Sequence, residues 1–221
     1  MGELKIADFK TTKLPENEVI RRILAGEKEL YEILMRRNNQ KLFRVLRGYI
    51  GDQGEIQDIM QDTYLQAYEK LYQYKQDAQF STWLIRIGIN KALARITKKA
   101  KIQATDVISI SDNVTIEIRD ETQPGPMDKM MRKEAKEILE KAIDNLDEKY
   151  RSVYIMGEVE EMSMTEISDC LDLSVSNVKV RLHRAKNMIK ENLYELSYSN
   201  ELFEFGFSKC DGLVERVLSR I

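Results

Sequence analysis

The chain has few of the residues from which catalytic and metal sites are most often built. It contains one histidine in 221 residues, and its two cysteines, Cys170 and Cys210, lie far apart with no CxxC pair. The sequence therefore predicts no metal site and no cofactor, and it offers no nucleophile–base pair and no phosphate-cradling glycine loop. Unpaired cysteines favour a reducing compartment. We expect a cytoplasmic protein that is not an enzyme.

Helix breakers and long apolar runs are also scarce. Three prolines and ten glycines among 33% charged residues are typical of a helical, interaction-rich protein. The longest apolar runs are a few residues, too short to cross a bilayer, and the mixed-charge start MGELKIADFKTTK does not resemble a signal peptide. We expect no membrane insertion. The net charge of −2 predicts no polyanionic partner on its own.

Apolar residues at helical spacing predict an all-α protein with two small helical domains. Helices are expected over 16–25, 27–50, 55–74 and 80–101, and again from about 128. The third helix is expected to gather its apolar residues on one broad face: Ile56, Ile59, Met60, Tyr64, Leu65, Tyr68 and Leu71 or Tyr72. The expected division is an N-terminal domain at 1–101, a linker at 102–127, a C-terminal domain at 128–196 and an extension at 197–221.

The segment 102–127 has a different character from its neighbours. It is acidic, rich in Ser, Thr and Asn, and ends in QPGP, which indicates a mostly irregular linker. A β-hairpin is the alternative over part of it, because Ile108 and Ile110, and then Val114 to Ile118, alternate at period two around SDN. Near the end of the chain, residues 213–221 indicate a short terminal helix.

The stretch SMTEISDCLDLSVSNVKVRLHRAKNMIK, residues 163–190, predicts two helices joined by a tight turn. Ser163 and Glu166 form a capping-box pattern, Asp172 suits a left-handed turn residue, and Ser174 is a good N-cap. Two short helices joined in this way describe a helix-turn-helix. Four residues of the second helix should face the core: Val178, Leu182, Ala185 and Ile189.

The second of these helices carries bases and no acid from Ser174 to Lys190. A carboxylate on this face would oppose the field of DNA phosphates, so its absence favours DNA binding. Asn177 and Arg184 are suited to read base edges, and Val180 to contact a thymine methyl group. The alternative is an amphipathic helix with a solvated basic face.

With these motifs in place, the whole chain resembles the bacterial sigma factors of the extracytoplasmic-function (ECF) group, in the sigma-70 family. Residues 146–193 resemble their C-terminal domain, which binds the minus-thirty-five promoter element, and the V-K-x-R-L-x-R-A core runs from Val178 to Ala185. The resemblance implies that eight residues contact this element: Ser176, Asn177, Lys179, Val180, Arg181, His183, Arg184 and Lys186.

Residues 30–101 resemble the N-terminal domain of the same family. EIQDIMQDTYLQAYEKL, residues 55–71, resembles the helix that docks on the clamp helices of the polymerase beta-prime subunit. Asp58, Gln61 and Asp62 match the polar positions of that motif, and acidic and amide groups suit a basic partner. A solvated face of a packed helix is the alternative.

FSTWLIRIGINKALARITKK, residues 80–99, resembles the element that melts and reads the minus-ten region. Residues 81–105 contain no acid, so their bases are free to meet phosphates. The preceding loop, 74–79, would receive a base turned out of the duplex, while Trp83 is expected in the core. The minus-ten residues implied by the resemblance are Tyr74, Lys75, Gln79, Arg86, Asn90, Lys91, Arg95 and Lys98.

The resemblance implies a sigma factor that binds core RNA polymerase, through the beta-prime clamp helices and the beta subunit, and directs promoter-specific initiation. Promoter DNA is an expected partner, as is an anti-sigma factor or another recruiting protein. The first alternative is a one-component helix-turn-helix regulator with a sensing domain at 28–101, against which the basic, acid-free stretch 81–105 argues. The second, an anti-sigma-like interaction protein, would need neither basic helix.

Overall fold

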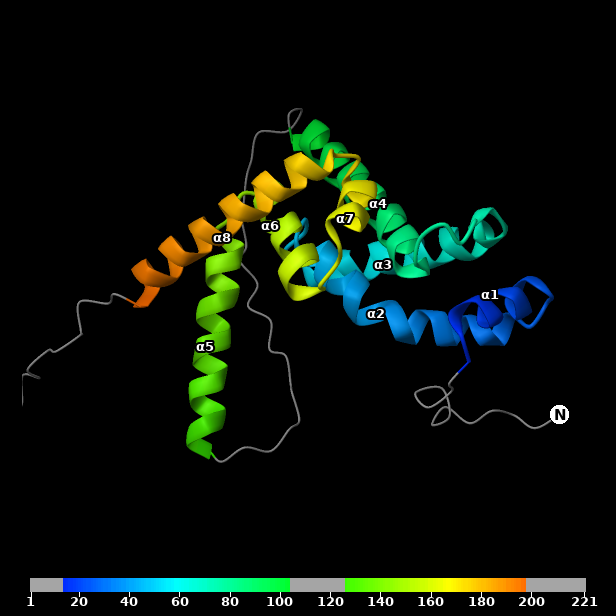
Figure 1. Ribbon diagram of the computed structural model, residues 1–221, viewed down its shortest axis with the longest axis horizontal. Coiled ribbons are helices and arrows are strands. Elements are labelled where there is room, and N and C mark those ends of the chain that lie inside the picture. The colour runs from blue at the N-terminus through cyan, green and yellow to red at the C-terminus, as the bar shows by residue number, and fades with distance from the viewer. Residues whose placement is uncertain (1–13, 104–125, 198–221) are drawn as a thin grey trace, which may run out of the picture. The chain divides into compact units, whose positions relative to one another are not determined.

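The computed structural model describes residues 14–103 and 126–197 (Figure 1). Within these two ranges every regular element is helical, which confirms the predicted fold class there. The elements are α1 (Glu16–Leu24), η2 (Lys28–Leu30), α2 (Tyr31–Arg47), α3 (Gln53–Glu69), η3 (Leu71–Gln73), α4 (Phe80–Gln103), α5 (Pro126–Asp144), α6 (Glu148–Tyr154), η4 (Ile155–Val159), α7 (Met164–Leu171) and α8 (Val175–Ser197). The hairpin and terminal-helix interpretations lie outside the described residues.

The described residues divide into two compact units. The first contains 14–103 and 146–186, and the second contains 126–145 and 187–197, so α8 contributes to both. Each unit therefore combines two segments that are separated in the sequence. The domain bounds expected from the sequence, 1–101 and 128–196, stay a prediction.

The core of the first unit lies where α2, α3 and α4 pack together. Leu42 and Leu46 of α2, Ile56 of α3 and Leu84 of α4 are almost completely shielded from solvent. Gly88 permits the close approach of α4 to α2, because a Cβ at this position would stand 2.9 Å from Leu42 Cδ1. The α2–α4 packing therefore depends on a residue without a side chain.

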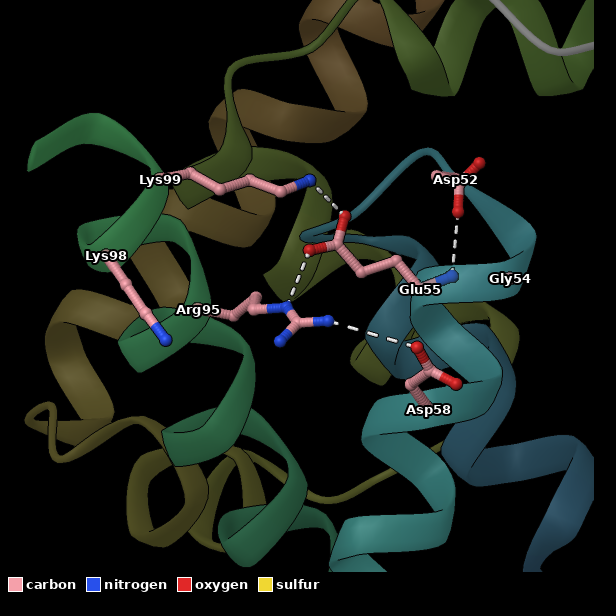
Figure 2. Close-up of a pocket in the computed structure, with 7 residues that line it drawn as sticks. All are labelled: Asp52, Gly54, Glu55, Asp58, Arg95, Lys98 and Lys99. Atoms are coloured by element: carbon pink, nitrogen blue, oxygen red, sulfur yellow. Dashed lines mark hydrogen bonds and ion pairs between the residues drawn. The ribbon is translucent and has the colours of Figure 1, made fainter. Parts of the chain in front are cut away.

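Polar contacts join the first turn of α3 to the last turns of α4 (Figure 2). Asp52 is the N-cap of α3, and its side chain accepts a hydrogen bond from the Glu55 backbone N–H at 2.7 Å. The Glu55 carboxylate in turn pairs with Arg95 and Lys99 of α4. The cap therefore fixes the turn from which Glu55 reaches across to the other helix.

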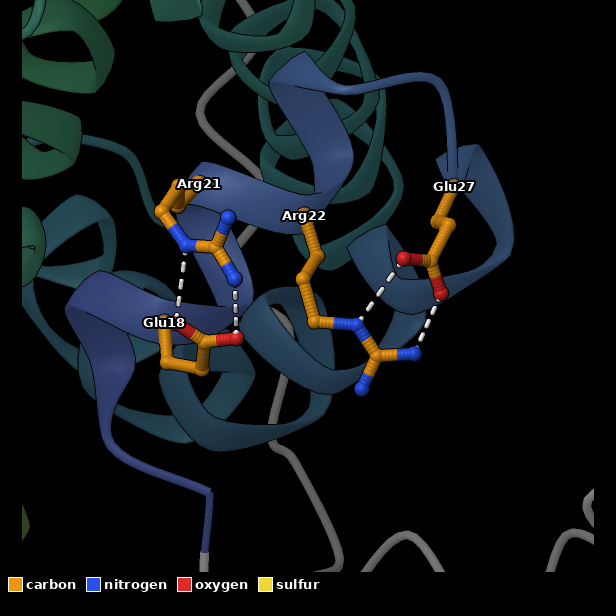
Figure 3. Close-up of polar contacts among 4 residues, drawn as sticks. All are labelled: Glu18, Arg21, Arg22 and Glu27. Carbon is orange, nitrogen blue, oxygen red and sulfur yellow. Dashed lines mark hydrogen bonds and ion pairs between the residues drawn. The ribbon is translucent and has the colours of Figure 1, made fainter.

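α1 carries two arginine–glutamate pairs on its exposed side (Figure 3). Arg21 makes a two-point contact with Glu18 within the helix, at 2.7 and 2.9 Å. Arg22 reaches past the helix end to Glu27, which the left-handed backbone of Gly26 (φ +108°) turns back towards α1. The second pair connects α1 with the turn that leads into η2.

The apolar face predicted for α3 is only partly correct. Ile56, Ile59 and Tyr64 are buried, whereas Leu65 is 57% exposed and Tyr68 is 42% exposed. α3 packs mainly against α2 and α4, and residues at the edge of its apolar stripe extend beyond these contacts. The helix also ends at Glu69, earlier than expected, and the tighter η3 turn follows it.

Other helix boundaries also differ from the sequence expectation, since α2 ends at Arg47 and α3 begins at Gln53. The helix expected over 27–50 begins with the η2 turn and becomes α-helical only at Tyr31. In the second unit, Ala142 of α5 and Ile189 of α8 are buried, and the Asn192 amide donates to the Ala142 carbonyl at 3.1 Å. Among the helices described, none has the length and apolar character needed to cross a membrane.

Candidate nucleic-acid interface

The turn between α7 and α8 has the local structure that its sequence dictates. Ser163 caps α7 by accepting the Glu166 N–H, and the Glu166 carboxylate accepts the Ser163 N–H at 2.9 Å, so both halves of the capping box are present. Asp172 ends α7 in the left-handed region at φ 53°. The Ser174 hydroxyl accepts the Asn177 N–H at 3.3 Å at the start of α8. The predicted helix-turn-helix geometry is confirmed.

The two faces of α8 separate as predicted. All four core residues are buried: Val178, Leu182, Ala185 and Ile189. Seven of the eight minus-thirty-five candidates are exposed: Ser176, Asn177, Lys179, Val180, His183, Arg184 and Lys186. The eighth, Arg181, is half-buried and donates from Nε to Asn177 Oδ1 at 3.0 Å. The side-chain oxygen of Asn177 is therefore already engaged by Arg181 within the same helix.

The charged groups of α8 differ in their surroundings. Lys186 pairs with Glu158, whose carboxylate lies 2.7 Å from its Nζ. Within residues 14–103 and 126–197, Lys179, His183 and Arg184 form no ion pair. The early part of α8 therefore presents uncompensated donors, whereas Lys186 meets a carboxylate from η4.

The minus-ten candidates on α4 are spread along the solvent-facing positions of that helix, called here the strip of α4. Arg86, Asn90, Arg95 and Lys98 are exposed, and Lys91 is half-buried. Arg95 is 3.1 Å from Glu55 Oε1 and 3.9 Å from Asp58 Oδ2 (Figure 2). Part of the charge of these candidates is therefore paired with α3.

The loop before α4 is supported by packed aromatic rings. Tyr74 lies 5.7 Å from Phe80 and 5.5 Å from Trp83 between ring centroids, and its hydroxyl donates to the Ala78 carbonyl at 2.5 Å. Burial raises the pKa of Tyr74, so the ring stays neutral near pH 7. Lys75 and Gln79 are exposed beside it. Trp83 packs against the core, as expected.

The polymerase-docking candidates lie on the outer side of α3, next to a groove. Asp58, Gln61 and Asp62 are all exposed. Gln61 also lines a groove of about 1120 Å³ between α2 and α3, whose apolar lining includes Met35, Phe43, Met60, Leu65 and Tyr68. The sequence analysis missed this groove, although the surplus of apolar residues on α3 was the signal for it.

Two hydrogen bonds hold the floor of this groove. The Tyr31 hydroxyl donates to the Tyr64 carbonyl at 2.8 Å, and the Tyr64 hydroxyl donates to the Met35 carbonyl at 3.2 Å. The Tyr31 and Tyr68 rings pack edge to face at 5.1 Å between centroids. The groove is therefore built on a fixed α2–α3 pair rather than on a loop.

The helix-turn-helix packs directly on the N-terminal helices within the first unit. Thr82 of α4 donates from its hydroxyl to Glu166 of α7 at 3.1 Å, and the Cys170 thiol lies 3.5 Å from the Thr82 carbonyl. Burial raises the pKa of the Cys170 thiol to about 12. Sequence reasoning did not find this contact, because nothing in the two segments marks them as neighbours.

A second set of contacts joins α2 to the segment around η4. Arg44 pairs with Glu160 at 3.0 Å, and Arg151 donates from Nε to the Gly48 carbonyl at 2.9 Å. The Glu160 side chain is only 8% exposed, so the acidic partner of this pair is largely shielded from solvent. Together with the Thr82–Glu166 bond, these contacts anchor α6 and α7 on α2 and α4.

Comparisons with known proteins agree with this arrangement. The family model for sigma-70 region 2 matches residues 34–102, and the model for sigma-70 region 4 matches residues 136–189. Together they cover more than half of the chain. A match to region 2 over most of residues 28–101 does not favour the alternative of a sensing domain there.

Individual relatives are sigma factors as well. The ECF RNA polymerase sigma-E factor of Haemophilus influenzae is 26% identical over 188 residues, which cover 83% of this chain and 98% of that protein. SigW of Bacillus subtilis is 26% identical over 184 residues, or 80% and 96% of the two chains. The sigma factor RpoE of Bartonella quintana, solved in complex with the anti-sigma factor NepR, has a similar fold, with a TM-score of 0.61 at 19% identity over 74% of this chain and 96% of its own.

The chain therefore belongs to the sigma-70 family of RNA polymerase sigma factors, in its extracytoplasmic-function group. As a member of that group it directs transcription initiation by RNA polymerase.

Glu166 gives a pH-dependent test of the α7–α4 contact. Burial opposes its ionisation, but hydrogen bonds from Ser163 and Thr82 outweigh this effect and hold its pKa below the usual 4.5. A lowered pKa adds stability that is present above pH 4.5 and is lost as pH falls through the native pKa. We expect Glu166→Gln to lower the melting temperature at pH 7, with the difference from wild type shrinking below about pH 4.5.

Thermal melts followed by circular dichroism between pH 3.5 and 7 measure this difference. Asp169→Asn is the matched control, because Asp169 is an exposed carboxylate of the same helix without a hydrogen-bond or ion-pair partner among the described residues. A Glu166→Gln deficit that is the same at every pH would contradict a role for the ionised carboxylate.

Proposed function

We propose that this sigma factor directs core RNA polymerase to a limited set of promoters through three surfaces: the outer face of α8, the exposed strip of α4 and the outer side of α3. The observation that carries the proposal is that both basic helices of the sequence have their acid-free faces exposed. The chain supplies recognition and no catalysis of its own, since phosphoryl transfer is the work of the polymerase. It acts in the cytoplasm, with the polymerase and the DNA.

We assign the minus-thirty-five contacts to the early part of α8. Lys179 and Arg184 are exposed and have no ion-pair partner among the described residues, so their donors are available to guanine edges or phosphates. Val180 is 50% exposed although it is apolar, which suits contact with a thymine methyl group. Lys186, held by Glu158, is assigned to the phosphates at most.

The minus-ten contacts are assigned to α4 and to the loop before it. Asn90 is exposed in the middle of the strip, with Arg86 and Lys91 nearby on the same helix. Tyr74 offers an aromatic surface beside the exposed Lys75, which suits a base turned out of the duplex.

The third surface is assigned to the clamp helices of the polymerase beta-prime subunit. Asp62 supplies negative charge, Gln61 supplies an amide at the groove, and Leu65 adds exposed apolar area. An apolar groove edged by acidic and amide groups suits an amphipathic basic helix. By analogy with RpoE of Bartonella quintana, solved with the anti-sigma factor NepR, an anti-sigma factor or other recruiting protein is a further proposed partner.

We further propose that the first unit opens when the promoter is bound. Thr82 and Glu166 lie 3.1 Å apart in the structure, so the two DNA-reading regions are in contact. The minus-ten and minus-thirty-five elements are named for their positions, which differ by about 25 base pairs. At about 3.4 Å per base pair, they lie about 85 Å apart along DNA. α7 must leave α4 for both elements to be read at once.

Reversal of the charge at Asp62 tests the docking surface. We expect Asp62→Lys to weaken core-polymerase binding roughly threefold to tenfold, because it places a cation opposite a basic partner. Asp62 is exposed and has no ion-pair partner among the described residues, so the fold should be unchanged. Glu69→Lys, an equal charge change at the far end of α3, is the control. Pull-down with core polymerase measures binding, and equal retention of both variants would contradict the assignment.

Two bases of α8 should respond differently to substitution. We expect Arg184→Ala to cost about 1–3 kcal/mol on the cognate promoter and little on scrambled DNA, because it removes a base contact. Lys190→Ala should weaken binding to all sequences alike and flatten the salt dependence by about one unit of slope.

Fluorescence anisotropy of the holoenzyme over a salt series separates the two effects, on a promoter selected by run-off transcription from a library. Neutral behaviour of both variants on every DNA would leave α8 as a solvated basic face.

A further inference from the structure

A cleft between the start of α3 and the end of α4 brings acids and bases together in equal number. Its volume is about 530 Å³, and Figure 2 shows how the side chains converge from the two helices. The charged residues that line it are Asp52, Glu55, Asp58, Arg95, Lys98 and Lys99. The end of α4 is acid-free in sequence, but α3 and its cap supply three carboxylates to it in space.

Glu55 is the best-enclosed acid of this cleft. Its side chain is 10% exposed, whereas that of Asp58 is 70% exposed. One Glu55 oxygen accepts from Arg95 Nε at 3.1 Å, and the other pairs with Lys99 Nζ. Asp58 adds a longer contact to Arg95 at 3.9 Å.

The geometry distinguishes a competitor from a positioning group. A carboxylate that orients a base for DNA binds behind its donor end and leaves that end open. On Lys99, Glu55 instead contacts Nζ, the only charged atom of that side chain, whereas on Arg95 it accepts from Nε, behind the two Nη groups. The oxygens of a DNA phosphate accept hydrogen bonds from the same donors as the carboxylate. A phosphate that binds these donors must therefore displace Glu55 or share the donors with it.

Lys98 provides an internal comparison. It lines the same cleft and belongs to the same turn of α4, yet it has no ion-pair partner among the described residues. Its charge is therefore fully available to a phosphate. Lys99 becomes fully available only after exchange with Glu55, whereas Arg95 can still present its Nη groups.

We propose that Glu55 is an intramolecular competitor of DNA phosphate, which lowers the sequence-independent affinity of the end of α4 for DNA. The inference rests on the proposed function, in which this strip of α4 lies on promoter DNA. Phosphate contacts carry affinity without sequence information, so Glu55 sets how much of the binding is electrostatic.

The experiment measures binding of reconstituted holoenzyme to a labelled promoter duplex and to a scrambled duplex over a salt series. Glu55→Gln should tighten binding to both DNAs roughly twofold to tenfold, the range expected for the release of two exposed ion pairs. It should also steepen the salt dependence by about one to two units of slope, because one or two more phosphates are neutralised. Glu69→Gln, which removes an exposed carboxylate from the other end of α3, should leave both quantities unchanged.

A double-mutant cycle that combines Glu55→Gln with Lys99→Ala provides a second test of the same role. Lys99→Ala should have little effect in the wild-type chain and a clear effect in the Glu55→Gln chain, where Lys99 has been released. Circular dichroism establishes that each variant is folded. Glu55→Asp, which keeps the charge but shortens the reach, should fall between wild type and Glu55→Gln.

The Lys98→Ala variant distinguishes failure of the competitor role from failure of the proposed function, because it should weaken DNA binding whether or not Glu55 is also changed. If Lys98→Ala weakens binding while Glu55→Gln is neutral or also weakens it, the competitor role is overturned and the proposed function stands. If Lys98→Ala, Arg95→Ala and Glu55→Gln are all neutral on every DNA, the end of α4 does not lie on DNA and both are overturned.

Discussion

The packing of α7 against the start of α4 is the interaction on which the arrangement of the first unit depends. Ile167 and Cys170 of α7 belong to the same buried cluster as Leu84 and Ile85 of α4, so the two DNA-reading regions share one core. Glu166 serves both sides, since it completes the cap of its own helix and accepts the Thr82 hydroxyl. A single carboxylate thus couples local helix formation to tertiary packing.

In the proposed function, the phosphate field of DNA acts on the outer faces of α8 and α4. It excludes carboxylates from the outer faces of α8 and of α4, but it places no such limit on neighbouring elements. Two carboxylates from neighbouring elements pair with bases of these helices: Glu158 of η4 with Lys186, and Glu55 of α3 with Lys99. The charge that DNA meets is therefore set by tertiary structure as much as by the basic helices themselves.

Local features were the most predictable from sequence. The cap at Ser163, the left-handed Asp172 and the buried stripe of α8 all follow from short-range rules, and all three are present. The exposure of Leu65 and Tyr68 was not predictable in this way, because helical spacing identifies an apolar face but not what covers it.

Features that depend on partners distant in the chain were not predictable either. The π-helical turn of η4 brings Gly157 against Leu182, where a Cβ would stand 3.2 Å from the leucine side chain, and this fit exists only after folding. The ion pairs of Arg95 and Lys99 likewise join residues about 40 positions apart in the chain. An acid-free stretch in a sequence therefore identifies candidate DNA contacts without showing which of them are already paired.

The distance between α4 and α7 before and after promoter binding tests most directly whether the first unit opens on DNA. Fluorescent labels at Ala94→Cys and Asp169→Cys, two exposed positions, report it by energy transfer in a chain in which Cys210 is replaced by alanine and the buried Cys170 is retained. We expect high transfer in the free protein and its loss in the promoter-bound holoenzyme, where the two promoter elements lie about 85 Å apart along DNA. High transfer retained in a complex that initiates transcription would contradict this expectation.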